Sequence, residues 1–419
     1  RSGRAMNRLV QGDVGSGKTA VAAFGAWTAA KSGCQCALMA PTELLAEQHA
    51  RTMDALLAPA GVRVALLTGS VKGKEKKALL SALSTGEIDL VVGTHALFSQ
   101  GVEYRALGLV IADEQHRFGV AQRSALAEKG GETPPHILVM SATPIPRTLA
   151  LIIYGDLDVS VMDELPPGRT PVATFAVGED KRQRMYGFVR KQVGLGRQVY
   201  IVCPAVEENG GGWEDTPGMD LKAVTAYARE LRERVFPDLR VGFVHGKLKA
   251  KEKETAMAAF TKGELDVLVS TTVIEVGVDV PNASLMIIEN AERFGLSQLH
   301  QLRGRVGRGK HESFCVLMTA SRSDTARERL RALCATNDGF QIAEEDLRLR
   351  GPGDFFGKRQ HGLPQLKVAD FAADMELLKE ARGAAEELIA ADPELKQPAH
   401  RLLKKKVREL FEENGELFN

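Results

Sequence analysis

An eight-residue stretch near the start of the chain, "GDVGSGKT" (12–19), has the spacing of a phosphate-binding loop. Its glycines allow backbone N–H groups to curl around phosphate oxygens, its lysine is placed to reach the β- and γ-phosphates, and its threonine hydroxyl is placed to bind Mg²⁺. A chance glycine-rich turn is the alternative, but a strand-like stretch before the motif and a helix-like stretch after it favour phosphate binding. The residues expected to bind nucleotide are Gly12, Gly15, Ser16, Gly17, Lys18 and Thr19.

The apolar stretch "LVIADE" (109–114) ends in two carboxylates, at the point where a buried strand would end. Asp113 is placed to hold Mg²⁺ through water, and Glu114 is placed to orient or deprotonate the attacking water. An exposed acidic turn is the alternative. Taken with the phosphate loop and Lys18, the pair predicts an NTPase that uses Mg²⁺.

A second cationic motif, "QLRGRVGRG" (301–309), lies far downstream of the phosphate loop. Arg305 and Arg308 are three residues apart, so we expect them to share one helical face and to approach a phosphate from across a cleft as arginine fingers. A solvated basic face is the alternative. If the fingers arrive only when two lobes close, hydrolysis is coupled to lobe movement, which is the design of a motor.

Short apolar stretches of strand length are the elements that would position these motifs. Continuous apolar runs of four to six residues are typical of strands buried on both faces of a parallel sheet, and ligands bind at the carboxyl ends of such strands. The runs fall into two groups separated by the proline-containing connector "DELPPGRTP" (163–171). The first group is 8–12, 36–42, 64–69, 89–94, 109–114 and 137–143, and the second is 198–204, 241–246, 266–272, 285–291 and 314–318.

The two groups of strands predict two α/β lobes, each with a parallel sheet. Within the second lobe the polar, glycine-rich stretch "EENGGGWEDTPG" (207–218) is expected to be a surface excursion. After about residue 320 the strand signal disappears and the sequence becomes mainly helical. There "HRLLKKKVREL" (400–410) has an apolar stripe opposite its cations, which is typical of an ordinary solvated helix, with DNA binding as the alternative.

Composition excludes several classes of protein. With 419 residues and 44% hydrophobic content the chain is long enough for two or three globular domains, and no apolar run approaches the roughly 20 residues that span a bilayer. Lys+Arg at 55 against Asp+Glu at 54 gives a net charge of +1, so a polyanion would have to be held by local patches. The five scattered cysteines lack CxxC spacing, which favours a reduced cytosolic protein over a zinc or disulfide protein. The chain lacks an initiator Met, and we expect a fragment whose N-terminal part is missing.

The ordered motifs resemble those of superfamily 2 helicases over about 300 residues. They are "GDVGSGKT", "PTELLAEQH" (41–49), "GTHAL" (93–97), "DEQH", "SATPIPRT" (141–148), "STTVIEVGVDVP" (270–281) and "QLRGRVGR". Within that superfamily, "DEQHRFGVAQR", "VMDELPPGRTPV", "YIVCPAVEE" and "ERFGLSQLHQLRGRVGRG" resemble the RecG family of bacterial branch-migration translocases, essentially from Arg4 to the C-terminus. The transcription–repair coupling translocases share "PIPRT" and "LRGRVGR" and are the alternative. The primosomal helicases carry cysteine clusters between the lobes that are absent from this sequence.

The resemblance implies a fold class of two tandem RecA-like P-loop lobes with parallel sheets, followed by a mainly helical C-terminal region with a helical hairpin and loop. The expected domains are the first lobe at 1–162, the second lobe at 163–320 and the hairpin, loop and C-terminal helices at 321–419. The implied activity is an ATP-dependent translocase that moves on duplex DNA and remodels stalled forks and Holliday junctions in recombination and repair.

The stretch "RERLRALCATNDGFQIAEEDLRLRGPGDFFGKRQHG" (327–362) matches the hairpin and loop that transmit lobe movement to duplex DNA in this family. Arg329, Arg350, Arg359 and Gln360 fall on those positions. The common family reading "GTRQSG" is "GKRQHG" in this chain, a departure that adds charge and keeps the arginine and glutamine. An arginine-stabilised loop that merely caps the hairpin is the alternative.

Other roles follow from motif position. The resemblance implies that Gly277 and Asp279 face the nucleotide cleft, where the aspartate would reach the ribose or an arginine finger. Residues expected to link the γ-phosphate to the DNA track or to contact a strand could equally be helix caps or turn residues. They are Thr42, Thr94, Ser141, Thr143 and Arg147.

The implied partners are branched and duplex DNA, with a single-stranded DNA-binding protein as a further candidate, and the implied setting is a monomer in the bacterial cytoplasm, associated with the nucleoid and with no membrane. The family's N-terminal wedge domain, which splits strands at a branch point, is not found in the sequence. Two other hypotheses stay open. One is an RNA or single-strand helicase, which would not need the hairpin and loop, and the other is a nucleotide-gated interaction module that does not translocate.

Overall fold

The computed structural model describes residues 5–13, 15–99, 101–113, 134–141, 157–162, 164, 171–204, 221–246, 248–271, 280–321, 323–350 and 375–413. The chain divides into two compact units. The first unit contains two separate parallel sheets, and the second contains the C-terminal helices α13 and α14.

The first sheet has seven parallel strands in the order β3-β4-β2-β5-β6-β1-β7. Six of them coincide with the predicted apolar runs, and β7 was not predicted. The strands are β1 Asn7–Gly12, β2 Gln35–Met39, β3 Val64–Leu67, β4 Leu90–Gly93, β5 Leu107–Asp113, β6 His136–Ser141 and β7 Asp158–Met162. All six predicted carboxyl ends therefore lie on one edge, which also carries the start of the phosphate loop and Asp113.

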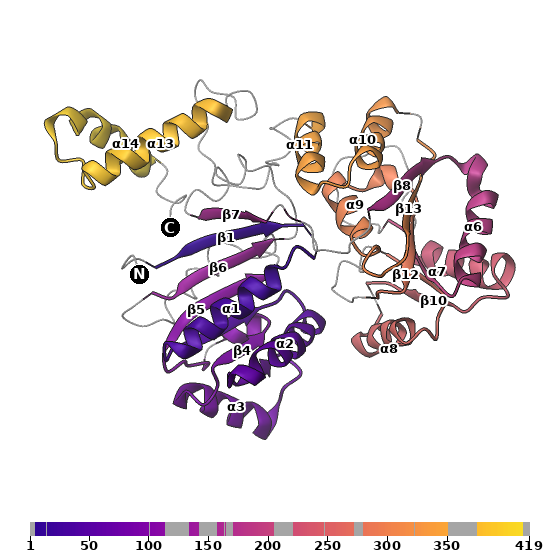
Figure 1. Ribbon diagram of the computed structural model, residues 1–419, viewed down its shortest axis with the longest axis horizontal. Coiled ribbons are helices and arrows are strands. Elements are labelled where there is room, and N and C mark those ends of the chain that lie inside the picture. The colour runs from indigo at the N-terminus through magenta and orange to yellow at the C-terminus, as the bar shows by residue number, and fades with distance from the viewer. Residues whose placement is uncertain are drawn as a thin grey trace. The chain divides into compact units, whose positions relative to one another are not determined.

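Helices cover both faces of this sheet. Successive residues of a strand point to opposite faces, so neighbouring residues of β2 pack against different helices. Leu38 of β2 packs in one apolar cluster with α1 (Lys18–Lys31) and α2 (Glu43–Leu57), which Figure 1 shows side by side over the sheet. Met39, the next residue of β2, packs in a second cluster with Leu83 of α3 (Gly73–Thr85). The fold of this lobe is therefore a doubly wound α/β sheet with its core on both faces.

The second sheet has six parallel strands in the order β10-β11-β9-β12-β13-β8. Its strands are β8 Val172–Val177, β9 Gln198–Val202, β10 Val241–Val244, β11 Val267–Ser270, β12 Ala283–Ile288 and β13 Ser313–Met318. The accompanying helices are α6 Arg182–Gly194, α7 Leu221–Glu230, which continues as a π-helix over Leu231–Val235, α8 Ala250–Thr261 and α9 Leu296–Arg303. The edge strand β8 was not predicted.

The two sheets repeat one arrangement of side chains. Before β3, the guanidinium and backbone N–H of Arg63 donate to Asp89, which precedes β4, with Nη2 2.8 Å from Oδ1. Before β10, Arg240 makes the same bonds to Asp266, which precedes β11, with Nη2 2.6 Å from Oδ1. The separation along the chain is 26 residues in both cases. The hydrogen bond from the guanidinium is the main reason why the pKa of each carboxyl is lowered.

A buried glutamine at the start of one central strand is repeated as well. Gln35 of β2 donates from Nε2 to the carbonyl oxygens of Leu83 and Ile88, at 2.9 and 2.8 Å. Gln198 of β9 donates in the same way to two carbonyls between the end of α8 and the start of β11. The two lobes therefore share their order of strands from β2 to β6 and from β9 to β13, with β1 and β8 in corresponding places.

The helical region begins with α10 (Asp324–Ala335) and α11 (Gly339–Arg350), which are joined by residues 336–338. Asp338 caps α11, because its Oδ1 accepts from the backbone N–H of Phe340 at 2.8 Å. These helices occupy the predicted hairpin, while its loop at 351–362 lies outside the described residues.

The second unit contains α13 (Met375–Ala391), the 3-10 helix Pro398–His400 and α14 (Arg401–Glu413). Asp392 fixes the turn between them by accepting the backbone N–H groups of Lys396 and Gln397, each at 2.9 Å. The predicted apolar stripe of the last helix is exposed, and Leu402 keeps 79% of its surface accessible. Among the described helices none is both long and apolar enough to cross a membrane.

Candidate nucleotide site and its coupling elements

The predicted phosphate loop connects the end of β1 with the start of α1. Gly15 and Gly17 have φ of 83° and 98°, in the left-handed region that glycine adopts without strain, and Gly17 is the residue before the helix. Lys18 Nζ donates to the carbonyl oxygens of Gly12 and Asp13, at 2.7 and 2.8 Å. The ammonium therefore lies across the loop, beside the N-terminal N–H groups of α1 that favour an anion.

Close packing explains why the loop begins with glycine. A Cβ atom at Gly12 would lie 2.5 Å from Ser16 Oγ and 2.9 Å from the Cβ of Met162 in β7. Both distances are shorter than side chains tolerate, so the loop can curl against β7 only with glycine at this position. The curled loop, its positive φ angles and the ammonium suit the phosphates of a nucleoside triphosphate.

Asp113 lies at the carboxyl end of β5, on the same edge of the sheet as the phosphate loop. Its backbone pairs with Met140 of β6, and β6 pairs in turn with β1. Its carboxylate accepts a hydrogen bond from His49, with Nε2 2.7 Å from Oδ2. His49 was not singled out from the sequence, although it is the last residue of the quoted motif "PTELLAEQH".

The oxygen donors at this edge suit Mg²⁺, which takes one or two protein oxygens together with phosphate oxygens and water. Thr19 supplies a hydroxyl from the first turn of α1, and Asp113 supplies a carboxylate. Within the described part of the chain, no cluster of three or more His, Cys, Asp and Glu side chains could hold a metal ion by itself. The donor set therefore fits a metal that is held jointly with the nucleotide.

The expectation that Arg305 and Arg308 share a helical face is wrong. Helix α9 ends at Arg303, with Gly304 as its C-cap, and Gly307 has φ of 80°. The two arginines therefore lie on the loop that follows the helix. The Nε of Arg308 donates to the Gly304 carbonyl at 3.1 Å, so this side chain folds back on its own loop.

A chain of buried polar side chains connects the phosphate loop to α10 within the first compact unit. Arg303, with 2% of its surface accessible, donates from Nη1 to the carbonyls of Leu333 and Thr336, at 2.7 and 2.8 Å. Its Nη2 lies 3.0 Å from Nδ1 of His300, and Nε2 of His300 lies 2.9 Å from Oδ1 of Asp13. Since a guanidinium only donates, Nδ1 accepts and Nε2 donates to the carboxylate. Sequence reasoning missed both residues.

The candidates for DNA contact in the first lobe have local structural roles. Thr42 is the N-cap of α2, and its hydroxyl accepts from the backbone N–H of Leu45 at 3.4 Å. Thr94 precedes the 3-10 helix His95–Phe98, and Ser141 is the buried last residue of β6. These roles leave their contact with DNA as a prediction.

Two of the predicted coupling residues lie on described helices. The guanidinium of Arg329 in α10 donates to the carbonyl of Phe294, which ties the helix to the segment before α9. Arg350 is the last residue of α11. The remaining predicted site residues lie outside the described part of the chain, as does the excursion at 207–218. They are Glu114, Thr143, Arg147, Gly277, Asp279, Arg359 and Gln360.

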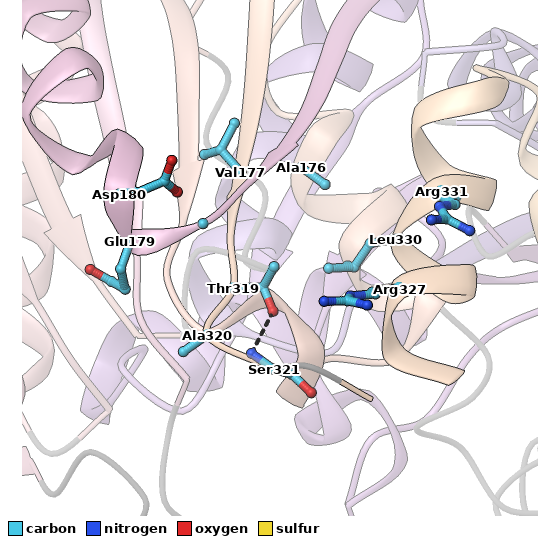
Figure 2. Close-up of a pocket in the computed structure, with 11 residues that line it drawn as sticks. Ala176, Val177, Glu179, Asp180, Thr319, Ala320, Ser321, Arg327, Leu330 and Arg331 are labelled. Atoms are coloured by element: carbon cyan, nitrogen blue, oxygen red, sulfur yellow. Dashed lines mark hydrogen bonds between the residues drawn. The ribbon is translucent and has the colours of Figure 1, made fainter. Parts of the chain in front are cut away.

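The second lobe contains a cavity of about 590 Å³ at the carboxyl ends of β8 and β13. Figure 2 shows the loops that follow these strands, with Asp180 and Thr319, opposite the α10 residues Arg327 and Arg331. Acidic and basic groups both line the cavity, so no single ligand charge is favoured. The face of α10 that carries Arg327, Leu330 and Arg331 lines this cavity.

Comparison with known families assigns each part of the chain. The family described as DEAD/DEAH box helicase matches residues 2–152, and the helicase conserved C-terminal domain matches residues 181–310. The family described as ATP-dependent DNA helicase RecG, domain 3, C-terminal, matches residues 336–417. The predicted fold class of two RecA-like lobes with parallel sheets and a helical C-terminal region is confirmed, and the matched families identify the lobes as those of a superfamily 2 helicase.

Individual relatives narrow the class. ATP-dependent DNA helicase RecG of Synechocystis sp. is 53% identical over 97% of this chain and 48% of its own length. The RecG proteins of Bacillus subtilis and Escherichia coli are each 53% identical, over 95% and 91% of this chain and 57% and 54% of their own. The chain belongs to the RecG family, and it spans about half the length of the curated relatives that it matches.

Solved structures agree with this assignment. A structure described as RecG bound to a three-way DNA junction has 46% sequence identity and a TM-score of 0.73, over 90% of this chain and 48% of its own. The helicase MrfA bound to DNA and AMPPNP, from a structure at 13% identity with a TM-score of 0.60, shares the fold alone.

Proposed function

We propose that this chain is the ATP-hydrolysing motor of a RecG-type helicase, which moves on duplex DNA to remodel stalled forks and Holliday junctions in recombination and repair. The observation that carries the proposal is the site at one edge of the first sheet. There Lys18 bonds two carbonyls of the curled phosphate loop after β1, and Asp113 is the last residue of β5, two strands away in the same sheet. The 53% identity to RecG proteins supports DNA as the substrate.

In this proposal the phosphate loop binds ATP through its backbone N–H groups, and Lys18 exchanges the carbonyls of Gly12 and Asp13 for phosphate oxygens. Thr19 and Asp113 hold Mg²⁺, which when bound neutralises charge on the phosphates. Glu114, the residue after Asp113, orients the attacking water and accepts its proton.

The second lobe is proposed to complete the site. Arg305 and Arg308 lie on the loop after α9, where the Arg308 side chain donates to the Gly304 carbonyl. They supply positive charge to the transferring phosphoryl group, an effect of about 10³–10⁵ in rate for arginine fingers. Gly277 and Asp279 are proposed to face the same nucleotide.

Transmission to DNA is proposed to use the hairpin that begins with α10. Arg303 bonds the C-terminal end of α10, so this end of the helix would move with the loop that carries the arginine fingers. Residues proposed to contact DNA or to couple its movement to hydrolysis are Thr42, Thr94, Ser141, Thr143, Arg147, Arg329, Arg350, Arg359 and Gln360.

The proposed division of the chain is the first lobe at 1–162, the second lobe at 163–320 and the coupling region at 321–419. A monomer that acts in the bacterial cytoplasm at the nucleoid suits a protein that tracks one duplex. A single-stranded DNA-binding protein is a proposed partner at such forks.

The test is ATP hydrolysis by one preparation in the presence of duplex, single-stranded and forked DNA. We expect duplex and forked DNA to stimulate turnover more than single strands, and Lys18→Ala to abolish turnover with all three. Stimulation by RNA or single strands alone would support a single-strand helicase. Nucleotide binding without steady turnover would support a nucleotide-gated interaction module.

A further inference from the structure

We infer that His49 is a positioning residue for the metal end of the nucleotide site, because its imidazole N–H fixes the Asp113 carboxylate in the orientation that holds Mg²⁺ of bound MgATP. The observation is the bond of 2.7 Å between Nε2 and Oδ2. The inference rests on the proposed function and adds a residue to its site.

The packing of α2 determines where His49 points. Ala46, Met53 and Leu57 are buried with 0%, 0% and 4% of their surface accessible, and they define the face of α2 that packs on the sheet. His49 lies three residues after Ala46 and four before Met53, so it falls on the same stripe. The imidazole therefore points toward the sheet and keeps only 13% of its side-chain surface accessible.

The backbone of Asp113 is held on both sides of its strand. Ala112 pairs with Met39 of β2, and Asp113 pairs with Met140 of β6. The remaining freedom at this residue is rotation of the carboxylate. A carboxylate only accepts, so Nε2 of His49 carries the hydrogen and selects one rotation.

Groups that orient a metal ligand have a measurable effect on the metal. Loss of such a hydrogen bond costs about 10- to 100-fold in metal affinity or activity. A histidine that only fills space under α2 would contribute to stability, but it would leave the Mg²⁺ dependence of nucleotide binding unchanged. Metal dependence therefore separates a positioning role from a packing role.

The experiment compares His49→Gln with His49→Asn in the full 419-residue chain. A glutamine amide nitrogen takes the place of Nε2, whereas an asparagine amide nitrogen takes the place of Nδ1 and falls short of Asp113. The matched control is His136→Ala. The Nδ1 of His136 accepts from the backbone N–H of Met6 at 2.8 Å, at the other end of the same sheet.

The first readout is equilibrium binding of a fluorescent ATP analogue as Mg²⁺ is titrated, with binding in EDTA as reference. The second is the Mg²⁺ dependence of ATPase turnover with duplex DNA. For His49→Asn we expect the half-saturating Mg²⁺ concentration to rise about 10-fold or more and kcat to fall, with binding in EDTA unchanged. His49→Gln and His136→Ala should titrate within about 2-fold of wild type.

Equal Mg²⁺ dependence in His49→Asn and His49→Gln would overturn the inference, whatever their melting temperatures. A parallel loss in both variants would also overturn it, because the imidazole would then act through packing. A wild-type chain without Mg²⁺-dependent nucleotide binding would instead refute the proposed function, so the two failures are distinguishable.

Discussion

Replacing Arg303 by methionine should loosen the C-terminal end of α10 and uncouple hydrolysis from movement. The arginine is buried with 2% of its surface accessible and supplies the donors for the Leu333 and Thr336 carbonyls and for Nδ1 of His300. The last carbonyls of a helix have no partner within the helix, so they depend on such donors. Methionine matches the unbranched stem of arginine as far as Nε and removes all of these hydrogen bonds.

The expected magnitude follows from these three contacts. A hydrogen bond from a charged group contributes about 1.5–3 kcal/mol, and a buried acceptor left without a donor costs about 1–3 kcal/mol. The contributions overlap, because the end of α10 can relax toward water. We therefore expect Arg303→Met to lower the free energy of unfolding by about 3–5 kcal/mol. Arg303→Lys keeps one point donor and should lose about half as much.

The assay is urea unfolding followed by far-UV circular dichroism, with Arg331→Ala as the matched control. Arg331 is an exposed arginine on the same helix, and its loss should change stability by less than about 0.5 kcal/mol. At a temperature where all variants stay folded, translocation is measured by displacement of a third strand from duplex DNA and divided by the ATPase rate. A stability loss under about 1 kcal/mol would refute the structural reasoning, and a wild-type ratio would refute the coupling.

Three further outcomes are expected. Lys18→Ala should abolish ATP hydrolysis, while Glu114→Gln should keep nucleotide binding and turn over at least about 10²-fold more slowly; near wild-type turnover would remove Glu114 from this role. Glu289→Ala should lower the free energy of unfolding in urea by about 2–3 kcal/mol, because the buried carboxylate bonds Arg182 at 2.9 Å through both oxygens; a loss under about 1 kcal/mol would contradict this. Backbone N–H groups of residues 396 and 397 lower the pKa of Asp392 from 3.8 to about 2, so its contribution to stability is present above pH 3.8 and is lost as the pH falls toward 2. In an acid titration followed by circular dichroism, Asp392→Asn should lack that component, and identical curves would refute it.

Most strands of the two sheets were predictable from the sequence, including the edge strands β3 and β10, whereas the edge strands β7 and β8 were not. Strands β2, β4 and β12 are mainly apolar and are buried along their whole length. By contrast β7 and β8 lie at the outer edges of their sheets, and their residues are mostly half-buried or exposed. A search for continuous apolar runs passes over such strands, because their sequences are mixed.

The site was predictable where its chemistry is local in the sequence. The phosphate loop depends on neighbouring residues, so its spacing alone predicted its conformation. The prediction that Arg305 and Arg308 share a helical face failed because α9 ends at Arg303, with Gly304 as its C-cap, before the chain reaches either arginine. His49 was missed because its partner Asp113 lies 64 residues away, a distance that no local pattern spans.

The repeated framework of the two lobes gives the cavity of the second lobe a particular meaning. In the first lobe, the loop after β1 and the end of its neighbour β6 lie at the edge that is proposed to bind phosphate. The corresponding strands of the second lobe are β8 and β13, and the cavity lies at their carboxyl ends.

Where the loop after β1 has "GSGKT" (15–19), the loop after β8 reads "GEDKR" (178–182), so Glu179 and Asp180 stand in place of Ser16 and Gly17, and Arg182 stands in place of the threonine. Both carboxylates line the cavity, opposite Arg327 and Arg331 of α10. The second lobe therefore repeats the strand order of the first without its phosphate-loop sequence. At the corresponding place it has a cavity lined by α10, the first helix of the predicted hairpin.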